Sequence, residues 1–320
     1  MNSIYWTFGI ALFVAIIIDL GLLSKKHQKV TFKKAIIQTI FWVVLSFAFC
    51  AFLYFDKGSA ELSLKYTAAY LMEWSLSIDN IFVFLLIFSF FRVDEADSGR
   101  ALLIGILLAI IFRIAFISLG IGIIERFHWV MYLFGIFLLY TGFKLFRKNQ
   151  EEEFDPNDSK IYQWTTRLFR ISDVDPNGRF FIKSNGKILF TKLSLVVLML
   201  AATDIVFALD SIPTVVSLVR DNIKVPFTSE EKLIIYSSNI FAVLGLRSLF
   251  FLLKNAIDKF KFLQQGIAVV LVFIGIKMLI DSFFPIPIYV SLIVIVVSIF
   301  SSIAYSIKIS NREKINDDIY

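Results

Sequence analysis

Two long apolar segments carry matching pairs of carboxylates: LMEWSLSIDNIFVF at residues 71–84 and LAATDIVFALDSIPTV at residues 200–215. The pairs are Glu73 with Asp79 and Asp204 with Asp210. Residues 66–91 and 193–219 contain no other charge. Exposing a charge to lipid costs several kcal/mol, so acids inside membrane-spanning segments face the protein interior and serve function by default. We therefore expect the four acids to face one another, or a cation, inside a helical bundle.

The similarity continues beyond the acidic segments at nearly constant spacing. GILLAIIFR at residues 105–113 matches NIFAVLGLR at 239–247, and TGFK at 141–144 matches IGIK at 274–277. The acidic pairs are offset by 131 residues, and the two later matches by 134 and 133. Three landmarks in the same order indicate two copies of a three-helix unit.

The copies occupy residues 64–147 and 193–280. A three-helix unit ends on the membrane face opposite to its start, so a second copy that follows a non-crossing connection is inverted. Inverted repeats are typical of secondary transporters, which bind substrate at the repeat interface. The rest of the chain divides into an N-terminal two-helix segment at 1–63, a cytoplasmic connector at 148–192, and a C-terminal helix with a cytoplasmic tail at 281–320.

Composition supports a membrane protein independently of these motifs. Hydrophobic residues make up 58% of the chain and the mean hydropathy is +0.77, whereas soluble domains are roughly 45–50% apolar. Apolar stretches of spanning length occur at about 4–23, 36–55, 66–91, 101–124, 129–146, 193–219, 233–253, 262–280 and 287–307. The sequence predicts an all-α membrane protein with about nine transmembrane helices that contain the two inverted repeats.

The two acidic segments exceed the roughly 20 residues that a span needs, so we expect them to tilt or break. Pro213 cannot donate to a preceding carbonyl and disfavours helical geometry at Ile212, which marks one expected break. On an ideal helix, residues six apart point about 120° apart and lie about 9 Å apart along the axis. For both acids of a segment to reach one ion, the helix has to open near the second acid, which Pro213 favours for Asp210; otherwise each helix serves two positions along a path.

Loop charges predict the orientation. Lys and Arg concentrate in the loops at 25–34, 92–100, 144–192 and 254–261 and in the C-terminal tail. Since cytoplasmic loops retain basic residues, we expect a bacterial plasma-membrane protein with its N-terminus outside and its C-terminus in the cytoplasm. The net charge of +6 then reflects contact with anionic membrane lipids, and no nucleic-acid partner is expected. The oligomeric state stays open.

The connector contains the only predicted elements outside the membrane. IYQWTTRLFR at residues 161–170 is typical of an amphipathic helix on the membrane surface. RFFIKSNGKILF at 179–190 predicts a hairpin, because Asn185-Gly186 favours a type I′ turn. About 40 residues are too few for an enzyme domain, so we expect a connector or a regulatory flap and no catalytic activity.

The polar groups inside the spans point to a hard divalent cation. Counting Asp19 with the four paired acids gives five negative charges, against the three positive charges of Arg113, Arg247 and Lys277, so −5 + 3 leaves −2. One divalent cation would balance this charge. Carboxylate, hydroxyl and amide oxygens suit Mn²⁺, Mg²⁺ or Ca²⁺. The chain has only His27, His128 and Cys50 as softer ligands, which disfavours zinc or copper within the membrane.

The expected metal-binding residues come from both acidic segments: Glu73, Asp79, Asn80, Asp204, Asp210 and Ser211. Supporting roles are assigned to Asp19, Arg113, Asn239, Arg247 and Lys277. We expect no resident cofactor, because the cation is the transported species. A second interpretation of these charges remains open. In it, Asp79 pairs with Arg113 and Asp210 pairs with Arg247, as structural ion pairs that fix the register of the helices.

Four segments of the chain together resemble the TerC family of integral membrane proteins, from about residue 19 to 277. They are EWSLSIDNIFVF, TDIVFALDSIPTV, DLGLLSKKHQKVTFKKA near the N-terminus, and SNIFAVLGLRSLFF at 238–251. The family is named for tellurite resistance, and the resemblance implies export of Mn²⁺ and related divalent ions. Four intramembrane carboxylates would repel an oxyanion such as tellurite, so we expect resistance to be an indirect consequence of metal homeostasis.

Three functions are weighed against each other. The leading one is a secondary transporter exporting a divalent cation in exchange for protons, because the chain has no GxxxxGK[ST] loop to use ATP. The second is an intramembrane aspartyl hydrolase, which fits poorly because the acids form two pairs and the YD and GxGD signatures are missing. The third is a non-transporting scaffold in the metal or tellurite stress response.

Overall fold

A computed structural model of the chain describes residues 2–18, 31–91, 93–147, 178–184, 187–220, 225–254, 262–280, 283–284 and 286–317. Nine long helices run through these residues: α1 (Asn2–Ile18), α2 (Phe32–Lys57), α3 (Ala60–Phe90), α4 (Glu95–Arg126), α5 (Val130–Arg147), α7 (Lys192–Val219), α8 (Ser229–Leu253), α9 (Leu263–Ile280) and α10 (Ile288–Asp317). Each corresponds to one predicted apolar stretch. Seven of them, all but α1 and α5, are long and apolar enough to cross a membrane by length and composition. The chain is therefore an all-α membrane protein.

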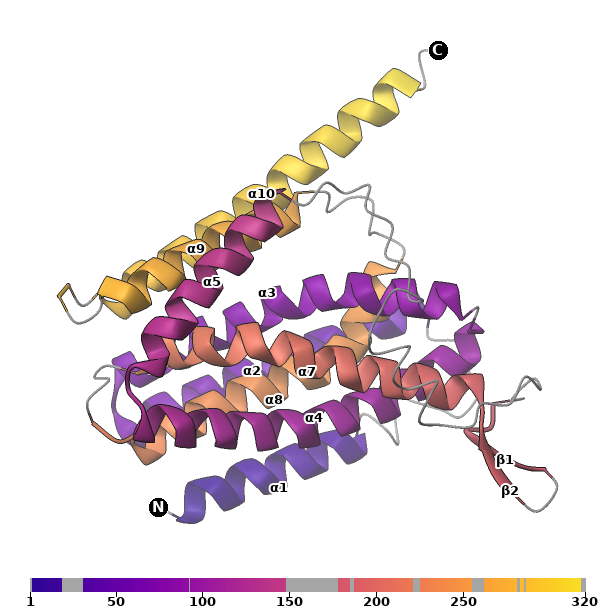
Figure 1. Cartoon of the computed structure of the whole chain (residues 1–320), viewed down its shortest axis with the longest axis horizontal. Coiled ribbons are helices and arrows are strands. Elements are labelled where there is room, and N and C mark those ends of the chain that lie inside the picture. The colour runs from indigo at the N-terminus through magenta and orange to yellow at the C-terminus, as the bar shows by residue number, and fades with distance from the viewer. Residues whose placement is uncertain are drawn as a thin grey trace.

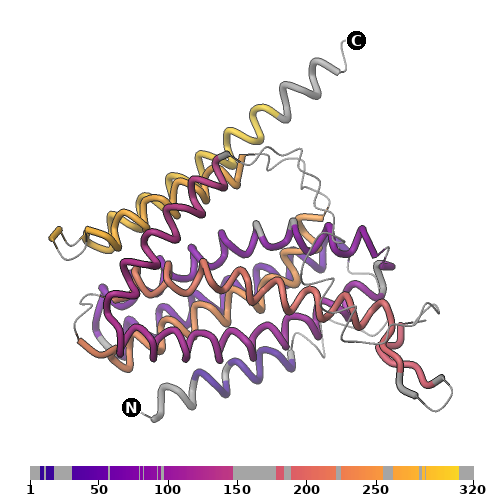
Figure 2. Tube along the Cα trace, viewed as in Figure 1, coloured from indigo at the N-terminus to yellow at the C-terminus, as the bar shows by residue number. Residues whose placement is uncertain are grey.

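The helices form two groups (Figure 1). Helices α2, α3, α4, α7 and α8 run side by side as the main bundle, while α5, α9 and α10 pack together across one side of it. Figure 2 traces the chain through both groups from α1 to α10. Helix α1 is attached through Phe8, whose ring lies 5.2 Å from that of Phe49 in α2 and 5.7 Å from that of Phe241 in α8.

The helix contacts keep their pattern when the two predicted copies are exchanged. Helix α3 packs against α8, and correspondingly α4 packs against α7. The first helices of the two copies, α3 and α7, contact each other, and so do the third helices, α5 and α9. An exchange of the two predicted copies would leave these four helix contacts unchanged.

Glycines permit the close approach of α5 and α9. A Cβ atom on Gly142 would lie 2.7 Å from Cγ2 of Val272, and one on Gly275 would lie 2.9 Å from the backbone oxygen of Gly135. Small residues at such positions let helix backbones pack closely in membranes. Gly105 has a similar role between α4 and α7, since its Cβ would meet Leu200 at 3.2 Å.

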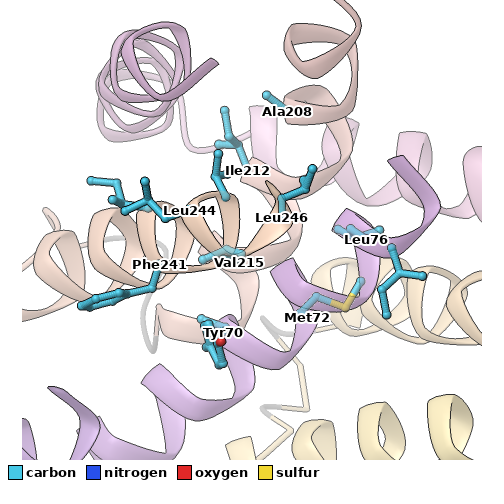
Figure 3. Close-up of a cluster of buried hydrophobic side chains, with 14 of the residues drawn as sticks. Tyr70, Met72, Leu76, Ala208, Ile212, Val215, Phe241, Leu244 and Leu246 are labelled. Carbon is cyan, nitrogen blue, oxygen red and sulfur yellow. The ribbon is translucent and has the colours of Figure 1, made fainter. Parts of the chain in front are cut away.

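Helix α8 lies at the centre of the bundle, and nearly all residues of its apolar stretch are buried. Figure 3 shows part of its surroundings, where apolar side chains of three helices meet. They are Tyr70, Met72 and Leu76 from α3, Ala208, Ile212 and Val215 from α7, and Phe241, Leu244 and Leu246 from α8. This packing holds the polar positions of α3 and α7 at fixed places in the interior.

Helix α7 corrects one expectation from the sequence. It runs unbroken from Lys192 to Val219 with Pro213 inside it, so the predicted break is wrong. Thr214 Oγ1 donates to the backbone oxygen of Asp210 at 2.6 Å, next to the carbonyl that Pro213 leaves without its helical donor. Membrane helices tolerate proline where Ser and Thr side chains satisfy the disturbed carbonyls. Helix α3 is continuous as well, from Ala60 to Phe90.

The predicted hairpin is confirmed. Strands β1 (Phe181–Ser184) and β2 (Lys187–Phe190) pair antiparallel, with Ser184 opposite Lys187, so a two-residue connection joins them. Its base is tied to the bundle, because Arg100 Nη1 of α4 donates to the Gly178 carbonyl at 2.6 Å. The predicted surface helix at 161–170 and the turn residues 185–186 lie outside the described residues.

Candidate cation site

Four helices bring one charged cluster together in the bundle interior. Glu73 comes from α3, Arg113 from α4, Asp204 from α7 and Asn239 from α8. Glu73 is fully buried, and the other three side chains are almost so. These are residues that the sequence placed in one site, two as metal ligands and two as supporting groups.

Arg113 bridges the two carboxylates. Its Nε donates to Asp204 Oδ2 at 2.6 Å and its Nη2 to Asp204 Oδ1 at 2.9 Å, a bidentate pair. Its Nη1 donates to Glu73 Oε2 at 2.9 Å and to Asn239 Oδ1 at 3.2 Å. Planar, two-pronged pairing of this kind is specific to arginine.

Asn239 completes the cluster. Its Nδ2 donates to Glu73 Oε1 at 2.6 Å, so each of the four carboxylate oxygens of Glu73 and Asp204 accepts at least one hydrogen bond. Two carboxylates share one guanidinium, so the formal charge of the ionised cluster is −2 + 1 = −1. Burying net charge in a low-dielectric interior is costly, so this cluster favours a further positive charge or a proton.

The two carboxylates of the cluster hold equivalent positions in the two copies. Asp204 lies 131 residues after Glu73, the same offset that relates Asp79 to Asp210. Arg113 belongs to the first copy, and its counterpart in the second copy is Arg247. Arg113 pairs with Glu73 and Asp204, while its pairing with Asp79 stays a prediction, because the Asp79 side chain lies outside the described part of the structure.

A second set of buried polar atoms has no hydrogen-bond partner among the described residues. They include Ser77 Oγ and Asn80 Nδ2 of α3 and Ser211 Oγ of α7, beside atoms in other parts of the bundle. Asn80 and Ser211 are again 131 residues apart. Ser211 lies near the Glu73 carboxyl without meeting hydrogen-bond geometry. Buried polar groups are normally satisfied, so unsatisfied ones at equivalent positions point to a bound species.

The structure describes some of the remaining predicted residues and not others. Asp210 is partly buried in α7, next to Ser211. Asp79 belongs to α3 through its backbone, but its side chain is outside the described part of the structure, as is all of Asp19. Arg247 is buried in α8. Lys277 of α9 donates from Nζ to the Ser217 carbonyl at 3.1 Å and to Ser291 Oγ at 3.4 Å, which ties α9 to α7 and α10.

The described residues do not form a ready-made metal cage. No group of three or more His, Cys, Asp or Glu side chains among them could hold a metal ion. Glu73 and Asp204 direct their oxygens at Arg113 and Asn239 instead. The six-residue metal site stays a prediction. A cation that binds Glu73 or Asp204 would lie beside the positively charged guanidinium of Arg113 and compete with it for these carboxylates.

A narrow cavity adjoins Asp204. Its walls come from the first half of α4, the first half of α7 and the final turns of α3 and α8, and Asp204 is its only charged lining residue. The lining residues are Phe84, Leu102, Gly105, Ile106, Ala109, Leu200, Asp204, Val243 and Leu246. The lining residues of α4 precede Arg113 in that helix, and Leu200 precedes Asp204 in α7, so these walls lie toward the starts of both helices. Sequence patterns gave no signal for it, since it depends on which helices are neighbours.

Comparison with known proteins agrees with this architecture. The family model described as "Integral membrane protein TerC family" matches residues 58–314. A protein of Myxococcus xanthus described as an uncharacterized membrane protein is 39% identical over 313 residues, which cover 98% of this chain and 94% of that protein. No solved structure matches.

Two further relatives cover most of the chain. The "Putative membrane-bound redox modulator Alx" of Escherichia coli strain K12 is 39% identical over 294 residues, or 89% of this chain and 88% of that protein. An uncharacterized membrane protein of Rickettsia felis is 36% identical over 292 residues, or 91% of this chain and 93% of that protein. The resemblance inferred from the acidic segments is confirmed.

Proposed function

The chain belongs to the TerC family of integral membrane proteins, and we propose that it is a secondary transporter that exports a hard divalent cation. The observation that carries this proposal is the buried interior of α3 and α7. Two carboxylates at equivalent positions share a single arginine there, and equivalent Asn80 and Ser211 carry unsatisfied polar atoms. Intramembrane acids of this kind mark ion pathways.

Mn²⁺ is the cation that we assign to this pathway. The available donors are carboxylate, amide and hydroxyl oxygens, which suit Mn²⁺, Mg²⁺ and Ca²⁺ and not the softer metals. Among these ions, the family resemblance favours Mn²⁺. The cation is cargo, so the ligand set has to bind it weakly enough to release it on the far side.

An inverted repeat would give the transporter its two access states. An odd number of helices in each copy reverses the second copy, and the exchange-symmetric contacts of α3, α4 and α5 with α7, α8 and α9 support this arrangement. With the N-terminus outside, the α4 and α7 starts face the cytoplasm. The cavity beside Asp204 then lies on the cytoplasmic side of the charged cluster, as an entry route for an exporter.

Proton exchange is the energy source that we propose. A carboxylate has to be deprotonated to bind a metal, so cation binding releases protons and proton return drives cation release. The paired acids supply both steps in one place. The chain therefore needs no nucleotide site of its own.

The competing function that the test can favour is a scaffold. A scaffold in a metal or tellurite stress response would use the acids only to hold the bundle. The redox role in the name of the Escherichia coli relative belongs to that protein. Here Cys50 is the only cysteine, so the chain cannot form an intramolecular disulfide.

Reconstituted protein tests the function directly. Proteoliposomes loaded with a metal-sensitive dye and given an outward-to-inward Mn²⁺ gradient should take up Mn²⁺ faster than protein-free liposomes, and a counter-gradient of protons should accelerate uptake. Sulfate and tellurite serve as anion controls and should not move. Mn²⁺ uptake no faster than in protein-free liposomes would favour the scaffold. Uptake that ignores the proton gradient would leave a uniporter.

Two exposed positions test the inverted topology. In a Cys50→Ser background, Val225→Cys lies just before α8 and Asp94→Cys just before α4, and both native side chains are exposed. These positions start corresponding helices, so inversion puts them on opposite membrane faces. An impermeant maleimide should label Val225→Cys in intact cells, and Asp94→Cys only after permeabilisation. Labelling of both in intact cells would contradict the inverted repeat.

A further inference from the structure

We propose that Arg113 is a tethered counter-ion that competes with the transported cation for Glu73 and Asp204, and that cancels one of their two negative charges while the metal-free transporter returns. This role rests on the proposed cation transport and adds to it the group that replaces the cargo. Arg113 would therefore act on the empty protein and not as a metal ligand, since a guanidinium has no lone pair to offer a metal.

The first argument is the occupancy of the carboxylate oxygens. Arg113 takes both oxygens of Asp204 and one of Glu73, at 2.6 to 2.9 Å, and Asn239 takes the other Glu73 oxygen at 2.6 Å. A metal ion coordinates through the same carboxylate oxygens, each of which keeps a second lone pair. A cation bound to either acid therefore lies beside the positively charged guanidinium, so the two positive groups repel each other and compete for the same carboxylates.

The second argument is the excess carboxylate. Asp204 alone would satisfy Arg113 as a bidentate partner and give a neutral pair. The structure instead brings Glu73 from the other copy onto the same guanidinium, which leaves a cluster of charge −2 + 1 = −1. A pair that served packing alone gains nothing from this buried excess charge. A cation site shared between the two copies requires both acids.

The third argument concerns the empty protein. Without Arg113 and without cargo, two buried carboxylates would face each other with charge −2, which opposes any movement that takes the site through the membrane interior. With Arg113 in place, one of the two negative charges is cancelled, and a single proton neutralises the other. Net transport needs the metal-free, protonated protein to return, whereas exchange of one Mn²⁺ for another needs only the loaded protein.

These two modes of transport give a test that separates this role from a structural one. Arg113→Gln removes the charge and keeps an amide that can hydrogen-bond one acid. The Mn²⁺ affinity of the purified Arg113→Gln protein can be measured from the decrease of the spin-resonance signal of free Mn²⁺. This affinity should be about tenfold or more higher than that of the wild type, the factor that corresponds to 1.4 kcal/mol of lost competition. Radioactive Mn²⁺ exchange between the two sides of proteoliposomes should persist, while net export falls to the level of protein-free liposomes.

Two further variants keep the result interpretable. Arg113→Lys retains the charge without the two-pronged geometry and should bind Mn²⁺ with an affinity between those of the wild type and Arg113→Gln. Lys232→Gln is the matched control, because it removes a half-exposed cation whose Nζ lies 2.9 Å from Glu125 Oε1 outside the cluster. It should leave Mn²⁺ affinity, exchange and net export unchanged.

The possible outcomes are distinct. If folded Arg113→Gln binds Mn²⁺ as the wild type does or more weakly, or if Arg113→Lys loses exchange together with net export, Arg113 is a structural ion-pair partner and the proposal is wrong. If Arg113→Gln cannot be purified, the affinity of Arg113→Lys decides, since no tightening there contradicts competition. A wild type that neither binds nor moves Mn²⁺ would instead remove the transport function itself.

Discussion

Replacing Asp204 with Asn should lower the free energy of unfolding by about 3 kcal/mol. The change breaks the bidentate pair in which Arg113 Nε and Nη2 donate to Asp204 Oδ2 and Oδ1 at 2.6 and 2.9 Å. Hydrogen bonds to charged groups contribute about 1.5–3 kcal/mol each, and the new amide NH₂ faces an N–H donor of the guanidinium. Glu73 still balances the charge of Arg113, so the loss comes from the broken hydrogen bonds.

Unfolding of the purified protein in mixed detergent micelles, followed by far-UV circular dichroism, measures this effect. Asp97→Asn is the matched control, because Asp97 Oδ1 lies 4.0 Å from Arg100 Nη1 in a partly exposed pair. Exposed pairs contribute about 0–1 kcal/mol, so the control should stay within about 1 kcal/mol of the wild type. Equal stability of Asp204→Asn and Asp97→Asn would mean that the buried bridge contributes nothing beyond a surface ion pair.

The sequence predicted the helices well because their signal is local. Each of the nine apolar stretches became a helix, from Asn2–Ile18 to Ile288–Asp317. The Asn185-Gly186 turn signal likewise predicted the pairing of Phe181–Ser184 with Lys187–Phe190. Hydrophobic runs and turn residues act within a few positions of themselves, so a single sequence suffices to recognise them.

Pro213 shows where a local rule failed. In isolation a proline interrupts a helix, yet α7 is continuous from Lys192 to Val219. Thr214 Oγ1 supplies a hydrogen bond to the Asp210 carbonyl at 2.6 Å. The sequence contained this threonine, but whether its side chain turns back to the helix depends on rotamer and packing.

The ion pairs of the candidate site lay beyond sequence reasoning for a different reason. The acids and Arg113 were identified as a set, and an ion pair of Arg113 with Asp79, on the preceding helix, was left open as an alternative. The structure packs α4 against α7 and α8, so Arg113 reaches Asp204 and Asn239 across the copies. Which helices become neighbours is a tertiary property. The equal offset of Glu73 and Asp204 was the one available hint that they lie across a shared interface.

The four acids form two equivalent pairs, of which one pairs with Arg113. Glu73 and Asp204 form one equivalent pair and hold Arg113. Asp79 and Asp210 form the other pair, six residues further along each helix. On an ideal continuous helix, residues six apart point about 120° apart and lie about 9 Å apart along the axis. On such helices a cation would meet the pairs in succession, with Asn80 and Ser211 directly after Asp79 and Asp210 in the sequence.

Replacing Asp210 with Asn should abolish Mn²⁺ flux while leaving protein abundance near that of the wild type. The change removes one carboxylate of the second pair, and every hydrogen bond that Arg113 makes to Glu73, Asp204 and Asn239 remains. Loss of residues that merely orient a metal ligand already costs about 10–100-fold in affinity or activity. Loss of a ligand should cost at least about a hundredfold, which in proteoliposomes is the level of protein-free liposomes.

Asp79→Asn should behave in the same way, because Asp79 is equivalent to Asp210 by the offset of 131. Glu61→Gln is the matched control: Glu61 is exposed and its carboxylate pairs with Lys65 at 2.9 Å at the start of α3. It removes one acid from the same helix and should leave flux unchanged. Mn²⁺ flux at the wild-type rate in Asp79→Asn or Asp210→Asn, at equal protein abundance, would assign these acids to the structure of the bundle. Of the two acidic pairs, only Glu73 with Asp204 would then be left to carry the cation. Flux would depend on how Arg113 and Asn239 release these two carboxylates.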